Sequence, residues 1–174
     1  MNFEQIKAAK ILVVDDGPAN VRRLERILTD AGYTNLSKVL DSRQALAMFG
    51  DDGPDLVLLS LHLPHPDGYE ILSKMRGLVP AGDFLAIIVL TENVAPEVRW
   101  KALEAGATDF LRKPIDRVDV ALRVENVLRT RFLHRQLQNQ TRLLEKRSKE
   151  RSELLERTIA DLRARSSPAI SENP

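Results

Sequence analysis

The chain has 174 residues, of which 43% are hydrophobic and 29% are charged, with a formal net charge of +1 and no cysteine. This composition suits one domain of ordinary size with residues to spare, and it argues against a wholly disordered chain. The lack of cysteine excludes disulfide bonds, a thiol nucleophile and thiolate zinc sites. Because no apolar run approaches the ~20 residues of a membrane span, we expect a cytoplasmic protein.

Three apolar runs predict strands that are buried on both faces, as in a parallel sheet: Ile11–Val14, Leu56–Leu59 and Leu85–Leu90. Weaker strand candidates are Leu36–Asp41 and Thr108–Leu111. Helical patterns alternate with these runs. The order predicts a parallel α/β sheet with helices on both faces.

The helical patterns have recognisable beginnings and ends. Pro18 suits the first turn of one helix, and Ser42 is a plausible N-cap for another over Ala45–Phe49. A third pattern follows Ile71, and a fourth ends at Gly106.

The fifth helical pattern is the longest. No proline or glycine occurs between Arg117 and about Arg165, which predicts one helix of roughly 70 Å. Its first turns carry Val118, Leu122 and Val127, which we expect to pack on the sheet.

Charge divides the chain near Pro114. Residues 1–115 contain 13 basic and 16 acidic side chains, whereas residues 116–165 contain 13 basic and 8 acidic ones. The long helix is therefore basic and the preceding region is acidic.

The helix beyond residue 130 has coiled-coil spacing. Spacings of four and three residues predict a coiled coil over residues 131–165, with a polar middle and a one-residue phase shift after Leu154. The alternative is a solvated, fraying helix. Parallel and antiparallel pairing both remain open, and residues 166–174 are expected to form a disordered tail. The seam comprises Leu133, Leu137, Gln140, Leu144, Arg147, Arg151 and Leu154, then Leu155, Ile159 and Leu162.

Polar side chains follow the predicted strands where each ends. Asp15 and Asp16 follow the first, Ser60 the third, Thr91 the fourth and Lys113 the fifth. Carboxyl ends of parallel strands meet at one edge of the sheet, so these groups should converge. Paired carboxylates suit Mg²⁺, and a lysine and a threonine suit phosphoryl oxygens. The alternative is that the aspartates cap a helix and the lysine forms a surface ion pair.

Four segments carry a family resemblance: ILVVDDGPANVRRLERIL, DLVLLSLHLPHPDGYEIL, IIVLTEN and GATDFLRKPI. Residues 8–130 resemble the receiver domain of bacterial two-component response regulators. The resemblance implies a receiver over residues 1–130, with a doubly wound, flavodoxin-like sheet of strand order 2-1-3-4-5. It also implies a histidine kinase or phosphotransfer protein as partner, phosphorylation of an aspartate, and Mg²⁺.

The resemblance assigns roles to the polar side chains. Asp15 and Asp16 become the metal pair, with Asp16 as the direct ligand and the backbone carbonyl of His62 as the third protein ligand. Thr91 and Lys113 become the groups that contact the phosphoryl group. Phe110 becomes the aromatic that changes rotamer on activation.

Position 60 departs from the family pattern, because Ser60 stands where the family has its phosphorylated aspartate. A serine cannot form the acyl phosphate, and the lost charge should weaken Mg²⁺ binding and let Lys113 pair with Asp16. Glu92, where the family usually has a small residue, should crowd the phosphoryl entrance. The serine is either natural degeneration or an introduced block.

These features predict a non-enzymatic response-regulator receiver whose phosphorylation site is blocked or degenerate. A dimeric coiled-coil helix would pass its conformational state to a partner or an output domain, such as a cyclic-di-nucleotide enzyme of a truncated longer chain. The alternative is a phosphorylation-independent pseudo-receiver that serves as a docking and dimerisation scaffold. The basic helix has interleaved acids, so we do not expect nucleic-acid binding.

Overall fold

The computed structural model describes residues 3–50, 53–80 and 82–166. The chain divides into two compact units, Met1–His134 and Arg135–Pro174. The predicted receiver boundary at residue 130 falls inside the first unit. The tail predicted for residues 166–174 lies, from residue 167 on, outside the described residues.

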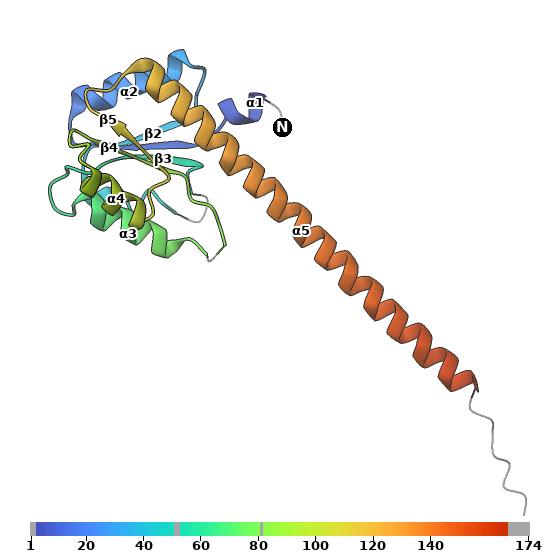
Figure 1. Cartoon of the computed structure of the whole chain (residues 1–174). Helices are drawn as coiled ribbons and strands as arrows, with labels where there is room; N and C mark the ends of the chain where they lie inside the picture. Colours follow the sequence, from blue (N-terminus) through green and yellow to red (C-terminus); the bar gives the residue numbers. More distant parts are fainter. Residues whose placement is uncertain (1–2, 51–52, 81, 167–174) are drawn as a thin grey trace, which may run out of the picture. The chain divides into compact units, whose positions relative to one another are not determined.

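The first unit contains a five-stranded parallel sheet of order β2-β1-β3-β4-β5, which confirms the predicted topology (Figure 1). Strands β1, β3 and β4 are buried along their whole length, because continuous apolar runs can be covered on both faces. The strands are β1 (Ile11–Val14), β2 (Leu36–Val39), β3 (Leu56–Ser60), β4 (Ile87–Thr91) and β5 (Asp109–Arg112).

Helices cover both faces of this sheet. Helices α2 (Pro18–Asp30) and the start of α5 (Arg117–Ser166) pack on one face, and α3 (Gly68–Leu78) and α4 (Pro96–Glu104) on the other (Figure 1). A short helix that the sequence did not predict, α1 (Phe3–Lys7), adds Ile6 to the first of these cores.

Two local predictions were wrong. The stretch Ala45–Phe49 forms turns instead of the expected helix, and it follows a 3₁₀ turn, η1 (Ser42–Gln44). Asp41, and not Ser42, caps it by accepting a hydrogen bond from the Arg43 backbone N–H at 3.0 Å.

The first turns of α5 also differ from expectation. Val118 and Leu122 are 64% and 58% exposed instead of packing on the sheet. The face of α5 that packs on the sheet comprises Val120, Val124, Val127 and Leu128.

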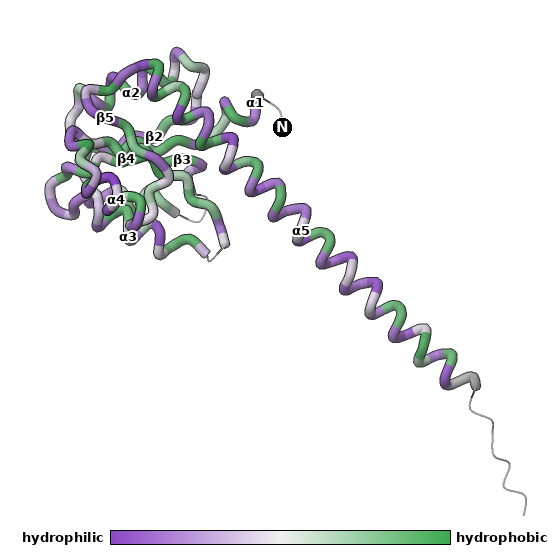
Figure 2. The backbone as a smooth tube through the Cα atoms, viewed as in Figure 1, coloured by the Kyte–Doolittle hydropathy of each residue, from purple (hydrophilic) through white to green (hydrophobic). Residues whose placement is uncertain are grey.

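The described part of the second unit is the rest of α5, and the 50-residue length of this helix confirms the predicted long helix. Hydrophobic and hydrophilic residues alternate in short bands along it (Figure 2). Its described side chains are exposed, apart from the half-buried Gln138. No helix in the described part of the chain is long and apolar enough to cross a membrane.

Candidate phosphoacceptor site

The carboxyl ends of β1, β3 and β5 bring Asp15, Ser60 and Lys113 together. The Lys113 ammonium donates a hydrogen bond to Ser60 Oγ at 2.9 Å and lies 2.6 Å from Asp15 Oδ2. Asp15 and Ser60 are buried, and the Lys113 side chain is 11% exposed. The three side chains therefore form a buried cluster in which one cation neutralises one carboxylate.

Local backbone geometry holds Asp15 in place. Its Oδ1 accepts hydrogen bonds from the Gly17 backbone N–H at 2.9 Å and from Asn20 Nδ2 at 3.1 Å. A Cβ at Gly17 would lie 3.0 Å from that oxygen, so glycine permits the close turn into α2. Sequence reasoning missed Asn20, although its place in the first turn of α2 was a usable signal.

The predicted pairing of Lys113 with Asp16 was wrong. Lys113 pairs with Asp15, which is buried. The next residue, Asp16, is exposed. The two neighbouring carboxylates thus lie in different environments.

The Ser60 hydroxyl takes part in one hydrogen bond as acceptor and in another as donor. It accepts from Lys113 and donates to the backbone carbonyl of His62 at 3.4 Å. A lysine that is paired with a carboxylate donates protons and does not accept one, so it cannot act as a base toward this serine. The arrangement holds Ser60 in place without activating it as a nucleophile.

Gly68 allows α3 to begin directly against the end of β3. A Cβ at this position would lie 2.3 Å from the Ser60 carbonyl oxygen and 2.5 Å from Leu61 Cα. Only glycine fits this approach, and sequence reasoning did not single it out. The only local signal was the Asp67-Gly68 pair, in which Asp67 caps α3 by accepting from the Glu70 N–H at 2.8 Å.

Thr91 is buried at the end of β4, where its hydroxyl serves its own loop. It donates to the Asn93 carbonyl and accepts from the Asn93 N–H, both at 3.1 Å. The backbone alone links this strand end to the cluster, through the Lys113 N–H and the Thr91 carbonyl at 2.8 Å. Glu92, expected to crowd the site, has an exposed side chain.

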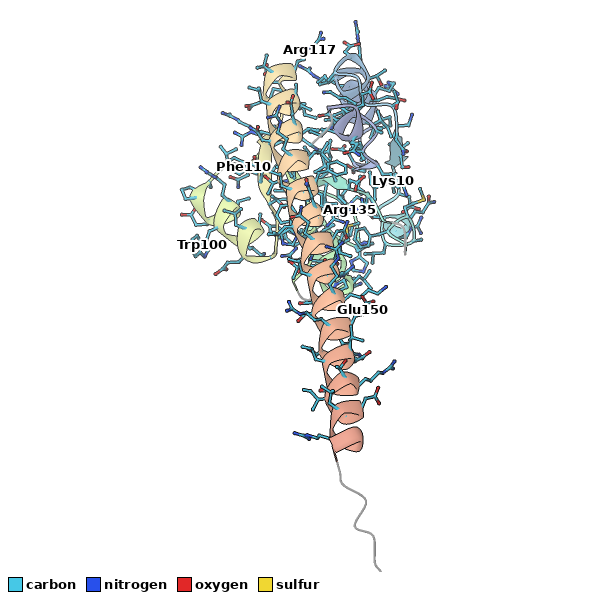
Figure 3. All side chains as sticks on the ribbon, turned by 90° about the vertical axis from the view of Figure 1, so that its right-hand side faces the viewer. Lys10, Trp100, Phe110, Arg117, Arg135 and Glu150 are labelled. Carbon is cyan, nitrogen blue, oxygen red and sulfur yellow. The ribbon has the colours of Figure 1, made fainter. Side chains whose placement is uncertain are left out.

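Phe110 lies half-buried on β5 (Figure 3), and two arginines lie close to its ring. The Arg99 guanidinium of α4 is 4.2 Å from the ring centroid, and that of Arg123 of α5 is 5.5 Å from it. Asp109 binds Arg123 Nη1 through both oxygens at 2.9 Å, and this hydrogen bonding raises the pKa of Arg123. Sequence reasoning missed both arginines.

A family model described as the response regulator receiver domain matches residues 11–125. The chain belongs to this family. Receivers of two-component systems imply a histidine kinase or phosphotransfer protein as partner, and they generally bind Mg²⁺ at the acidic pocket.

Similar proteins agree with this assignment. Response regulator PleD of Caulobacter vibrioides is 40% identical over 126 residues, which cover 72% of this chain and 27% of PleD. Response regulator MprA of Mycobacterium tuberculosis is 37% identical over 122 residues, or 70% of this chain and 51% of MprA. The chain therefore spans about a quarter to a half of these relatives.

Solved structures have the same fold. A CheY-like response regulator receiver domain protein from Methanospirillum hungatei superposes with a TM-score of 0.64 at 27% identity, covering 71% of this chain and 96% of that protein. NtrX from Brucella abortus gives a TM-score of 0.68 at 30% identity, covering 76% of this chain and 29% of NtrX.

The acidic pocket of this receiver fits Mg²⁺ poorly. One oxygen of Asp15 accepts two hydrogen bonds and the other pairs with Lys113, while the His62 carbonyl accepts from Ser60. Within residues 3–50, 53–80 and 82–166, no group of three His, Cys, Asp or Glu side chains could hold a metal. Only Asp16 is left as an exposed carboxylate ligand.

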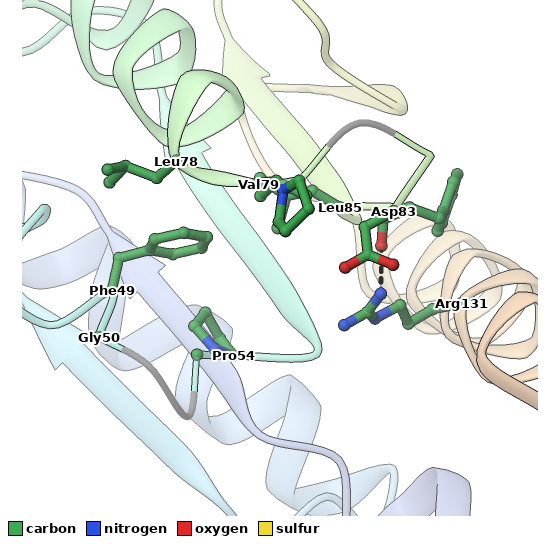
Figure 4. Close-up of a pocket in the computed structure, with 11 residues that line it drawn as sticks. Phe49, Gly50, Pro54, Leu78, Val79, Asp83, Leu85 and Arg131 are labelled. Carbon is green, nitrogen blue, oxygen red and sulfur yellow. Dashed lines mark hydrogen bonds between the residues drawn. The ribbon is translucent and has the colours of Figure 1, made fainter. Parts of the chain in front are cut away.

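A cavity of about 400 Å³ lies elsewhere on the receiver (Figure 4). Pro54 and Leu85, which precede β3 and β4, contribute to its lining, so it lies at the amino ends of these strands. Arg131 of α5 borders it and donates to the Phe84 carbonyl. Ser60 is at the carboxyl end of β3, so the cavity is not part of the phosphoacceptor site.

Proposed function

We propose that this receiver works in two-component signalling without phosphorylation at position 60. The observation that carries the proposal is the Lys113 ammonium, which binds the Ser60 hydroxyl at 2.9 Å and Asp15 at 2.6 Å. The family reaction needs a carboxylate nucleophile to form an acyl phosphate, and a serine hydroxyl held by an ammonium group cannot replace it.

The charge of the site supports the same proposal. An aspartate at position 60 would make three carboxylates against one lysine, whereas Ser60 leaves two. One charge pair at ~4 Å and an effective dielectric constant of about 20 is worth roughly 4 kcal/mol. Mg²⁺ therefore binds this pocket more weakly than it binds a receiver with the aspartate.

We further propose that α5 conveys the state of the receiver as a homodimeric coiled coil. Apolar side chains in the second unit support a partner helix, because a highly charged single helix of this length is marginal in water. The exposed ones include Leu137, Leu144, Leu155 and Ile159. The output is then a bound partner or a further domain, such as a cyclic-di-nucleotide enzyme, in the cytoplasm.

The alternative role is a pseudo-receiver, a constitutive docking and dimerisation scaffold outside any phosphorelay. The Lys113 cluster favours this alternative as well, because it holds the site in one state. Neither role includes catalysis or nucleic-acid binding.

Intact-mass measurement after treatment with acetyl phosphate and Mg²⁺ tests the blocked site. The unsubstituted chain should gain no phosphoryl group, and Ser60→Asp should gain one. Ser60→Asn is the matched control, because it adds similar bulk without the carboxylate. A phosphoryl group on an aspartate of the unsubstituted chain would contradict the proposal.

A further inference from the structure

Helix α2 exposes three arginines that are close together in the sequence. Arg22, Arg23 and Arg26 are all exposed. Residues three and four apart on a helix are neighbours, so Arg26 is next to both of the others. Like charges at this spacing destabilise a helix, so the cluster does not contribute to the stability of α2.

Neither acidic residue of α2 neutralises these arginines. Glu25 binds the Lys38 ammonium of β2 at 2.5 Å, and Asp30 lies 3.4 Å from Arg117 Nη2 of α5. Among the residues that the structure describes, the three arginines form no ion pair. Both acids that α2 could offer are therefore bound to other cations.

Other arginines of the receiver unit do have acidic partners. Arg43 binds Asp41 at 2.7 Å, and Arg129 binds Glu125 at 2.8 Å. Residues 1–115 also contain more acidic than basic side chains, 16 against 13. The arginines of α2 thus form a positive patch on a region that is acidic as a whole.

Arg117, at the start of α5, extends this patch to a second helix (Figure 3). The four arginines border a cavity of about 460 Å³, a volume typical of small-ligand sites. Four guanidinium groups and one carboxylate give this arginine cavity a formal charge of +3. Its lining comprises Arg22, Arg23, Arg26, Ile27, Asp30 and Arg117.

We propose that the arginine cavity binds a small anion with several linked phosphates, such as the triphosphate chain of a nucleotide. A guanidinium group can bind two phosphate oxygens at once, so four of them around one cavity match an anion with about three or four neighbouring charges. An acidic helix of another protein fits less well, because neighbouring carboxylates on one helix face are a turn apart.

This site is separate from the phosphoacceptor site and goes beyond the function proposed above. Its lining includes neither Asp15, Ser60 nor Lys113. The anion would therefore bind without contacting the Lys113 cluster.

Asp30 should oppose the anion, because it is the one carboxylate in the lining. Its ion pair with Arg117 is 3.4 Å long, and the two side chains are 41% and 67% exposed. Such exposed pairs are weak, so a bound phosphate can take Arg117 from Asp30. Removing this carboxylate should strengthen binding, whereas removing an arginine should weaken it.

Calorimetric titration of the full chain with inorganic triphosphate, in EDTA and at low salt, tests the site. Arg26→Gln should weaken binding at least about tenfold, because it removes a charged hydrogen-bond donor. Asp30→Asn should tighten binding at least about twofold. Arg76→Gln is the matched control, because it removes an exposed arginine from α3 on the other face of the sheet, and it should change the affinity less than about twofold.

A second titration, with adenosine triphosphate, separates two sources of the phosphate chain. An affinity equal to or higher than that of triphosphate identifies a nucleotide, and a lower one identifies a free inorganic phosphate chain.

Three outcomes would overturn the inference. The first is that triphosphate does not bind the unsubstituted chain. The second is that Arg26→Gln and Arg76→Gln have equal effects, or that Asp30→Asn binds no more tightly, because the attraction would then come from overall charge. The third is that hexaglutamate binds more tightly than triphosphate, which would assign the cavity to an acidic protein. None of these outcomes changes the phosphoryl labelling of Ser60→Asp.

Discussion

Replacing Lys113 with methionine should strongly destabilise the receiver. The ammonium lies 2.6 Å from Asp15 Oδ2, and the two side chains are 11% and 0% exposed. At that separation and an effective dielectric constant of about 20, the attraction is about 6 kcal/mol before desolvation. Because the variant leaves Asp15 buried and unpaired, the free energy of unfolding should fall by about 3–5 kcal/mol. Domains of this size have about 5–15 kcal/mol in total.

A double-mutant cycle separates the ion pair from lost packing. Asp15→Asn in the Lys113→Met background removes the stranded charge and keeps an oxygen for Gly17 and Asn20, so most of the stability should return. Urea unfolding at pH 7, followed by circular dichroism, measures all four proteins. Lys74→Met is the control, because its exposed pair with Glu70 is worth under about 1 kcal/mol. A loss below about 1 kcal/mol in Lys113→Met, or no recovery in the double variant, would refute the reasoning.

Three further substitutions test other contacts. Gly68→Ala should cost about 1–3 kcal/mol because its Cβ meets the β3 backbone, while Gly77→Ala, with open space around it in the same helix, should be neutral or stabilising in thermal melts. Burial raises the pKa of Tyr33 to about 12 from 10.0, and its hydroxyl has no partner among the described residues. The contribution of the buried, neutral Tyr33 to the free energy of unfolding is thus present below pH ~10 and is lost as pH rises through ~12. Tyr33→Phe should abolish this decline in unfolding measured against pH, and it should cost no stability at pH 7. Arg123→Gln should cost about 1 kcal/mol in urea unfolding, and Asp109→Asn added to it should cost little more if their pair accounts for the effect.

The parts of the fold that could be predicted are those that depend on the local pattern of apolar and polar residues. The apolar runs identified β1, β3 and β4, and even the weaker candidates located β2 and β5 to within about two residues. The prediction for the stretch after Ser42 was wrong because helical spacing over a few residues does not distinguish an α-helix from a 3₁₀ turn followed by turns. The prediction that Val118 and Leu122 pack on the sheet was wrong because several faces of α5 are partly apolar. Which of these faces packs on the sheet depends on the sheet as a whole.

The site was predictable only as a set of strand ends. Convergence of Asp15, Ser60 and Lys113 follows from parallel topology, but the partner of Lys113 depends on which aspartate turns inward. The arginines around Phe110 come from α4 and α5, which precede and follow β5 in the chain, and their approach to the ring depends on how these two helices pack beside β5. No local spacing reports such an approach.

Stability measured against Mg²⁺ concentration tests most directly whether Ser60 has removed the metal-dependent chemistry of this receiver. Saturating MgCl₂ should raise the free energy of unfolding of Ser60→Asp by about 2–3 kcal/mol, as expected for a ligand near 100 times its Kd. The unsubstituted chain, with Asp15 already paired to Lys113, should gain less than about 0.5 kcal/mol under the same conditions. An equal gain in both proteins would contradict the account.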